Sequence, residues 1–249
     1  MTASTRERPD SAVIRPYEPR DRAAVRDIAC RTAFRNMGSD RLFEDREIHA
    51  DYWTKYYTDY RPGDVLVIEE DGAVIGYFFG LTDHAHFARV MGRRIVPSCL
   101  GRALWRWATG RYEKEETKRY IRHALFHAWK EAPELPYGDY PATYHFNILR
   151  QGYGRGYYTE LVLRFLDRLE AMGIHGIHGH ITEPAGGKGI WHRFDKLCPE
   201  AEVQVYSEKP NTLFRYVLGD RREMVNRGWA VKVEDYRIWT RWLREHMRL

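Results

Sequence analysis

The chain has 249 residues, 43% of them hydrophobic and 14% aromatic, which is enough for one large domain or two small ones. The formal net charge of +5 is consistent with a polyanionic ligand, but it is not the composition of a dedicated nucleic-acid binder. Three widely spaced cysteines argue against a disulfide framework and favour a reducing compartment. No apolar run approaches the ~18 residues of a membrane span, and the polar start MTASTRERPDS is not a signal peptide. We therefore expect a cytoplasmic protein with no membrane partner.

Strands and helices of a single domain are predicted along most of the chain. Residues 1–11 are expected to be a disordered lead-in, and residues 12–249 the domain itself. An Asp-Gly pair at 71–72 lies between apolar, β-rich runs at 65–68 and 73–81, which predicts a hairpin. The other predictions are a strand at 13–16, helices at 21–34, 45–57, 100–107, 115–130 and 190–197, strands at 174–181, 203–207 and 229–236, a turn at 226–228 and a final helix at 240–249.

Residues 83–141 differ in character from the segments on either side. They hold 11 Lys and Arg against 7 Asp and Glu, so most of the positive excess of the chain lies here. We interpret them as a helical insertion between the third and fourth strands, because the segment is too short and polar to hold a core of its own. A solvated basic face is the default explanation of the charge, and contact with an acidic ligand is the alternative.

The chain is organised around residues 142–173, which predict a strand, a glycine-rich turn and a helix. Period-2 alternation runs from Ala142 to Ile148, and an apolar stripe with the period of a helix follows the turn. Glycines at 152, 154 and 156 let backbone N–H groups approach an anion at the positive end of the helix dipole. Together with the strand at 174–181, this is a βαβ unit with parallel strands. The stripe consists of Tyr158, Leu161, Val162, Phe165, Leu166 and Leu169.

The spacing of the turn excludes two common phosphate-binding loops. A P-loop needs a Lys-Ser or Lys-Thr pair after its last glycine, where this chain has Tyr157 and Tyr158. A dinucleotide fingerprint that started at Gly154 would need glycine or alanine at position 159, where this chain has Thr159.

The pattern that does fit is Gln-x-x-Gly-x-Gly at Gln151, Gly154 and Gly156, which resembles the acyl-CoA pyrophosphate loop of the GNAT acetyltransferase superfamily. The segment VIRPYEPRDRAAVRDIACRTAF resembles the first strand and helix of that family, and DYWTKYYTDYRPGDVLVIEEDGAVIGYFFG its second helix and hairpin. The resemblance covers roughly residues 12–198. More narrowly, TYHFNIL and the insertion resemble acetyltransferase-like domains related to those that accompany O-GlcNAc hydrolases.

The resemblance implies an α/β fold, with a mixed, centrally splayed sheet flanked by helices and the insertion between strands 3 and 4. It also implies acetyl-CoA as cofactor and transfer of an acetyl group to a primary amine by direct attack in a ternary complex. The pyrophosphate would lie on the backbone N–H groups of residues 152–156, and the pantetheine arm along the end of the fourth strand. The implied cofactor-binding residues are Asn147, Ile148, Leu149, Gln151, Gly152, Tyr153, Gly154, Arg155, Gly156 and Tyr157.

Acetyl transfer to an amine needs a base and a group that stabilises the developing oxyanion. His145, central in the strand beside the turn, is the first candidate for the base, since an unperturbed imidazole titrates near neutrality; a packed histidine is the alternative. Asp83 and Glu183, at the ends of the third and fifth strands, are further candidates, with loop capping as their alternative.

Aromatic residues of the helix at 45–57 are candidates for the wall of an acceptor pocket. Tyr52, Tyr56 and Tyr57, together with Trp53, are its members, although periodicity requires about half of them to face the core. No metal site is expected, because the histidines at 123 and 127 and at 175, 178 and 180 lack the remaining ligands in a suitable spacing.

The sequence leaves two classes of function open. One is an active N-acetyltransferase acting on a small-molecule or peptide amine. The other is a catalytically impaired GNAT-like module that binds CoA or a macromolecular partner. The family often carries a tyrosine in the helix after the fifth strand, where this chain has Phe194, with His192 two residues earlier. Nucleic acid is not the expected partner, and a homodimer is left open.

Overall fold

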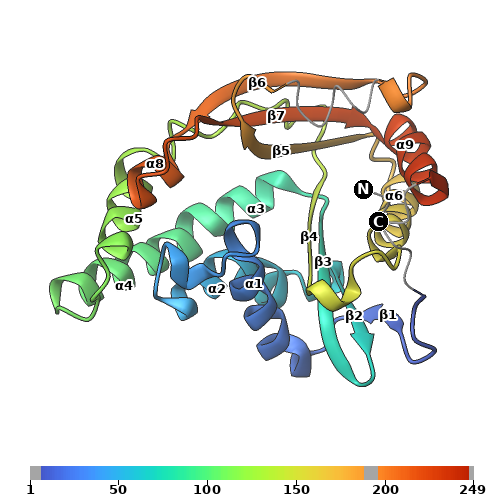
Figure 1. Ribbon diagram of the computed structural model, residues 1–249. Helices are drawn as coiled ribbons and strands as arrows, with labels where there is room; N and C mark the ends of the chain where they lie inside the picture. The colour runs from blue at the N-terminus through green and yellow to red at the C-terminus, as the bar shows by residue number, and fades with distance from the viewer. Residues whose placement is uncertain (1–6, 188–195, 247–249) are drawn as a thin grey trace.

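The computed structural model describes residues 7–187 and 196–246. Figure 1 shows two sheets meeting at an angle, with helices on both sides of the first. The strands are β1 Val13–Pro16, β2 Val65–Glu70, β3 Ala73–Leu81, β4 Thr143–Ile148, β5 Gly176–Pro184, β6 Val203–Asn211 and β7 Met224–Lys232. The helices are α1 Arg22–Asn36, α2 Arg46–Lys55, α3 His84–Val90, α4 Val96–Ala108, α5 Glu115–Phe126, α6 Tyr157–Ala171, α8 Leu213–Leu218 and α9 Val233–His246.

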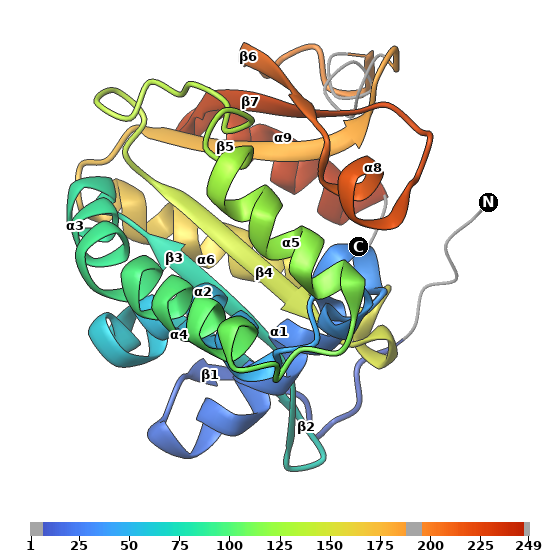
Figure 2. The same ribbon diagram turned by 90° about the vertical axis from the view of Figure 1, so that its left-hand side faces the viewer.

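The two sheets have the orders β1-β2-β3-β4 and β5-β7-β6, and every ladder within them is antiparallel. A single parallel bridge, between Ala142 and Ile177, joins them where β4 and β5 begin. From there the two strands diverge, as Figure 2 shows. The mixed, centrally splayed sheet with a helical insertion between strands 3 and 4 is therefore confirmed.

Two local predictions are confirmed with their physical causes. The turn of the β2–β3 hairpin has positive φ at both Asp71 (49°) and Gly72 (77°), the backbone that two-residue hairpins require. In α6 the predicted stripe faces the core, and its five members from Leu161 to Leu169 are each at most 4% exposed.

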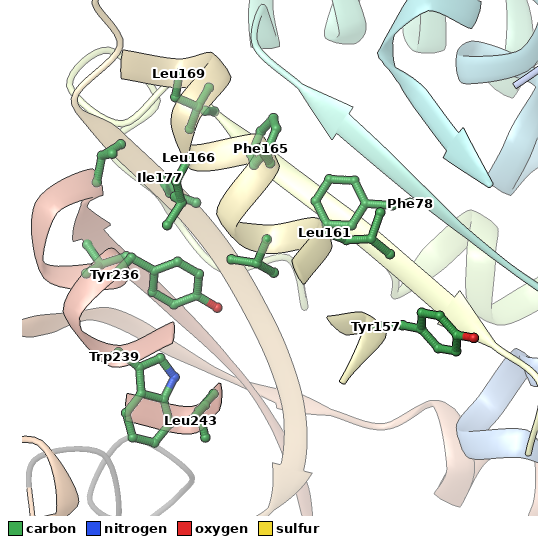
Figure 3. Close-up of a cluster of buried hydrophobic side chains, with 14 of the residues drawn as sticks. Phe78, Tyr157, Leu161, Phe165, Leu166, Leu169, Ile177, Tyr236, Trp239 and Leu243 are labelled. Carbon is green, nitrogen blue, oxygen red and sulfur yellow. The ribbon is translucent and has the colours of Figure 1, made fainter. Parts of the chain in front are cut away.

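The core has two parts, one on each face of the first sheet. Helices α1 to α5 pack on one face, against β2 and β3. Helices α6 and α9 pack on the other face, and this cluster also reaches β5 and β7. Figure 3 shows the second cluster, in which Phe165 of α6 lies near Phe78 of β3 and Trp239 of α9 lies below Tyr236. One continuous apolar layer therefore connects the two sheets although their strands part.

The insertion is tied to the first sheet through its positive charges. Arg102 of α4 lies 2.5 Å from Asp51 of α2, and Arg106 of α4 pairs with Asp45, which also caps the start of α2. The hydroxyl of Tyr112 donates to Asp45 at 2.7 Å. Part of the basic charge of residues 83–141 therefore neutralises buried carboxylates instead of facing solvent.

The C-terminal region differs from its prediction. Asn226, Arg227 and Gly228 lie inside β7 and do not form a turn, and α9 begins at Val233, well before residue 240. Gly228 is required by close packing, because a Cβ there would lie 2.9 Å from Pro133 and from Leu135. The short helices α3 and α8 were not predicted, and the predicted helix at 190–197 lies outside the described residues except for its end.

In the described part of the chain, no helix is long and apolar enough to cross a membrane.

Candidate functional site

The free edge of β4 is the first component of the site. Ala142 donates to Gly176 O at 3.4 Å and accepts from His178 N at 2.8 Å, so its backbone points toward β5. Leu149, of opposite parity, donates to Ile75 O of β3 at 2.8 Å. Because backbone direction alternates along a strand, the N–H groups of residues 144, 146 and 148 also point toward β5, which has parted from them. No strand of the described chain pairs with that edge beyond the bridge.

The glycine-rich turn follows directly after β4 and leads into α6. Gly154 and Gly156 have φ of 75° and 72°, a backbone that favours glycine. Gly156 is the N-cap residue of α6, and no side chain caps this helix end. Among the described residues, no acceptor is hydrogen-bonded to the N–H groups of Gly154, Arg155 and Gly156. These groups, with the positive end of the helix dipole, can bind an anion.

Two N–H groups that the sequence assigned to the anion are used within the turn. Gly152 N donates to Leu149 O at 2.9 Å, and Tyr153 N donates to Arg150 O at 3.2 Å. A Cβ at residue 152 would lie 2.3 Å from Ile148, so glycine is needed there for packing. The backbone N–H groups that remain available to an anion are therefore those of residues 154–156.

Charged side chains surround the turn on the side of β2. Arg155 lies 2.5 Å from Glu70, and the buried Tyr157 hydroxyl donates to the same carboxylate at 2.6 Å. Arg8, in the predicted lead-in, donates to Arg155 O at 2.7 Å and pairs with Glu160. Its guanidinium lies 4.3 Å from the centre of the Tyr157 ring. The sequence could not predict these contacts of Arg8, because no local pattern indicates that the lead-in reaches the turn.

His145 lies on the face of β4 that packs toward α2. Its ring stacks on Trp53 at 5.5 Å and 22°, and the Asn147 side-chain amide lies 3.0 Å from its Nε2. Asn147 also donates to the Tyr77 hydroxyl at 2.6 Å. Burial, with a smaller effect of His180, lowers the pKa of His145 to about 4. The imidazole is therefore neutral at pH 7, with a nitrogen that accepts from Asn147, and it is a weaker base than the sequence suggested.

The opposite face of β4 carries a cluster of three tyrosine hydroxyls. Tyr144 lies 2.6 Å from Tyr158 of α6 and 2.5 Å from Tyr236 of α9, oxygen to oxygen. Tyr158 and Tyr236 are 3.0 Å apart. Burial raises the pKa of Tyr144 and Tyr236 well above the usual value, so these hydroxyls remain protonated. The sequence could not indicate the cluster, since its members come from three elements and Tyr236 was assigned to a strand.

The other predicted site residues lie apart from this edge or make structural contacts. The Asp83 side chain accepts from His86 N at 2.9 Å and caps α3. Glu183 of β5 pairs with Arg227 of β7. Tyr56 and Tyr57 are 1% and 7% exposed and pack in the core, which revises the expectation that they line an acceptor pocket. Tyr52, at 41%, is exposed. His192 and Phe194 lie outside the described residues.

No protein-family model matches the chain. No curated protein matches it either. Among solved structures, the crystal structure of a protein called SsHAT has a TM-score of 0.57 and 22% identity, over 90% of this chain and 98% of that chain. This likeness and the strand order agree on the architecture. The chain has a GNAT-like fold.

Two further structures were matched more distantly. YncA of Salmonella typhimurium, a putative acetyltransferase solved with its cofactor acetyl-CoA, has a TM-score of 0.46 and 14% identity, over 90% of this chain and 95% of that one. A GNAT superfamily phosphinothricin acetyltransferase of Sinorhizobium meliloti in complex with AcCoA has a TM-score of 0.46 and 13% identity, over 89% and 88%. The GNAT-like fold of the present chain rests on its own topology and the SsHAT comparison. The narrower resemblance to O-GlcNAc-associated domains stays a prediction.

Proposed function

We propose that this protein is an acetyl-CoA-dependent N-acetyltransferase that transfers an acetyl group to a primary amine within a ternary complex. One observation carries the proposal: the uncapped N-terminus of α6 lies one glycine turn after β4, whose edge is paired with no strand of the described residues beyond the bridge to β5. The first feature suits a diphosphate and the second an extended amide chain, and CoA contains both in that order.

The residues present fit the cofactor. N–H groups of Gly154, Arg155 and Gly156 would hold the pyrophosphate, and Gln151, an exposed residue of the turn, lies beside them. The pantetheine arm would pair with β4 near Asn147 to Leu149. When bound, acetyl-CoA supplies an acetyl group activated as a thioester.

The two faces of β4 offer different groups to the reaction. As the new C–N bond forms, the C–S bond breaks, the amine gives up one proton and the thiolate takes one up. His145 is the candidate acceptor for the amine proton, which it can take only at Nε2, so the Asn147 amide that donates to Nε2 and positions the ring must release it as the proton arrives. The hydroxyl cluster of Tyr144, Tyr158 and Tyr236 is the candidate hydrogen-bond donor that stabilises the departing thiolate, which then takes its proton from solvent. This assignment replaces the missing tyrosine at position 194 with residues from β4, α6 and α9.

Acetyl-CoA should raise the melting temperature, since a ligand at one hundred times its Kd stabilises the native state by about 2.7 kcal/mol. The variant Gly154→Ala should abolish most of this shift, because Gly154 has φ of 75° among the free N–H groups. Gly173→Ala, at the other end of α6 with φ of 68°, is the matched control. Both should lose about 1 kcal/mol of stability through the same backbone strain, but Gly173→Ala should keep the shift.

Release of free CoA thiol across a panel of amines tests the catalytic part. Release that depends on both acetyl-CoA and an amine supports the transferase. A thermal shift without release from any amine would instead favour the binding module. The absence of any shift at millimolar acetyl-CoA and CoA would contradict both.

A further inference from the structure

Aromatic rings form a continuous series on the side of β4 that carries His145. Trp53 stacks on His145 and meets the ring of Tyr52 edge-on at 5.4 Å. Trp53 also lies 6.3 Å from His49, which lies 5.6 Å from Phe34 of α1. The series therefore runs from the end of α1 across α2 to the free strand, and it leads to the candidate base.

The backbone at the end of α1 is strained, and the strain places one of these rings. Phe34, Arg35 and Asn36 have φ of 51°, 61° and 65°, three successive non-glycine residues in the left-handed region. Each such residue costs of order 1 kcal/mol or more, and strain of this kind concentrates at functional sites. Phe34 consequently turns toward Tyr120 of α5, at 5.9 Å, and toward His49.

This aromatic surface is accessible to solvent. Tyr52 and Trp53 are 41% and 39% exposed, large fractions for aromatic side chains. Burial nevertheless raises the pKa of Tyr52, so part of its ring lies against protein. Exposed rings of this kind can stack with the ring of a small-molecule ligand.

The nearby carboxylates already have partners. Asp51 of α2 pairs with Arg26 and Arg102, and Glu183 of β5 pairs with Arg227. Polycationic acceptors, such as polyamines or lysine-rich peptides, are normally bound by unpaired carboxylates. Among the described residues, the surface next to His145 therefore offers stacking and cation–π contacts to a ligand, with these two carboxylates already neutralised.

We infer that the acceptor is an aromatic primary amine whose ring packs against the exposed parts of Tyr52 and Trp53, with its amino group directed toward His145. This inference rests on the proposed acetyltransferase function and names the substrate class of that same site. The low basicity of His145 is consistent with it. An arylamine is mostly unprotonated at neutral pH, so a weak base need only remove the proton released as the amide forms, whereas an arylalkylamine must first lose its ammonium proton to solvent.

The test compares kcat/KM for aniline, 2-phenylethylamine and tryptamine with that for propylamine, spermidine and a lysine-containing peptide. We expect aromatic amines to be preferred by at least about tenfold, the range of one well-packed ring. Aniline against 2-phenylethylamine separates arylamines from arylalkylamines. A kcat/KM for spermidine or the peptide that equals or exceeds the aromatic values would overturn the inference.

Trp53→Leu should raise KM about tenfold more for aromatic amines than for propylamine. Trp105→Leu is the matched control, because Trp105 of α4 is 53% exposed and lies against Arg111, away from this surface. Equal effects of the two substitutions would contradict the inference.

Calorimetric titration of 2-phenylethylamine into the wild-type protein, Trp53→Leu and Trp105→Leu, with and without CoA, separates this inference from the proposed function. Binding that only Trp53→Leu weakens supports the aromatic site even if no acetyl transfer occurs. Failure of acetyl-CoA to bind, together with retained amine binding, would overturn the proposed function alone. No binding of any aromatic amine to wild-type protein, in the presence of CoA that does bind, would overturn the aromatic site alone.

Discussion

Several imidazoles of this protein are buried as neutral groups, and this couples its stability to pH. His49 of α2 and His178 of β5 are 4% and 5% exposed, and burial lowers the pKa of each to about 4. Unfolded histidine titrates near 6.5, so the unfolded chain binds more protons below that pH. The stabilising contribution is therefore complete above about pH 6.5 and is lost as the pH falls toward 4.

We expect the burial of each of these imidazoles to lower the free energy of unfolding by about 3 kcal/mol at pH 4 relative to pH 7. Urea unfolding at pH 7.0, 5.5 and 4.5 measures this change. In His49→Gln the free energy of unfolding should fall less steeply with decreasing pH than in the wild-type protein. His175→Gln, at an exposed position, is the control and should follow the wild-type curve. An unchanged slope in His49→Gln would show that this imidazole does not remain neutral in the fold.

At the scale of elements, the close approach of α6 to β3 depends on a missing side chain. A Cβ at Gly80 would lie 2.7 Å from Phe165, a distance that real contacts do not allow. Gly80→Ala should therefore push Phe165 out of its rotamer or shift α6, at a cost of about 1–3 kcal/mol. Chemical denaturation measures this loss.

Gly101→Ala in α4 is the matched control, because nothing lies within 4 Å of a Cβ there. Alanine is the better helix former, so this variant should be neutral or more stable by up to about 1 kcal/mol. If Gly80→Ala behaved in the same way, the packing distance between α6 and β3 would not be limiting.

The elements that could be predicted are those whose signal is local. The β2–β3 hairpin was predicted from an Asp-Gly pair, which forms its turn in the structure. Helix α6 was predicted from an apolar stripe, which is the face that it buries. β7 was misplaced because Asn226 and Gly228 normally indicate a turn. Here the Asn226 side chain donates to Glu131 O at 2.9 Å. Gly228, without a side chain, leaves room for Pro133 and Leu135, which precede β4. Both contacts join residues about 95 positions apart, which a local pattern cannot show.

The same limit applies to the site. The glycine turn was visible in the sequence because its spacing is local, and it predicted the region that we propose binds an anion. The protonation of His145 could not be predicted, because it depends on Trp53, Asn147 and His180 around it. The contacts of Arg8 with the turn and the tyrosine hydroxyl cluster likewise join segments that are distant in the sequence, so no local pattern predicts them.

At the scale of the molecule, the N-terminal and C-terminal sheets are joined by side chains more than by backbone. One bridge connects their strands, whereas the cluster in Figure 3 includes Phe78 of the first sheet, Ile177 of the second, and α6 and α9 between them. The insertion adds a second connection, since His123 of α5 lies 3.3 Å from Thr212 before α8. The strands of the two sheets thus part along β4 while side chains still connect them.

The parted edge of β4 has a consequence for amide hydrogen exchange. N–H groups of Thr143, His145 and Asn147 point into the ladder with β3, whereas those of Tyr144, Phe146 and Ile148 point to the edge that β5 has left. Protection in the free protein should therefore alternate residue by residue along one strand, with the second set exchanging faster. Saturating acetyl-CoA should slow that set selectively, and site-resolved exchange by NMR would show it. Uniform protection along β4 in both states would mean that its edge offers the ligand no backbone groups.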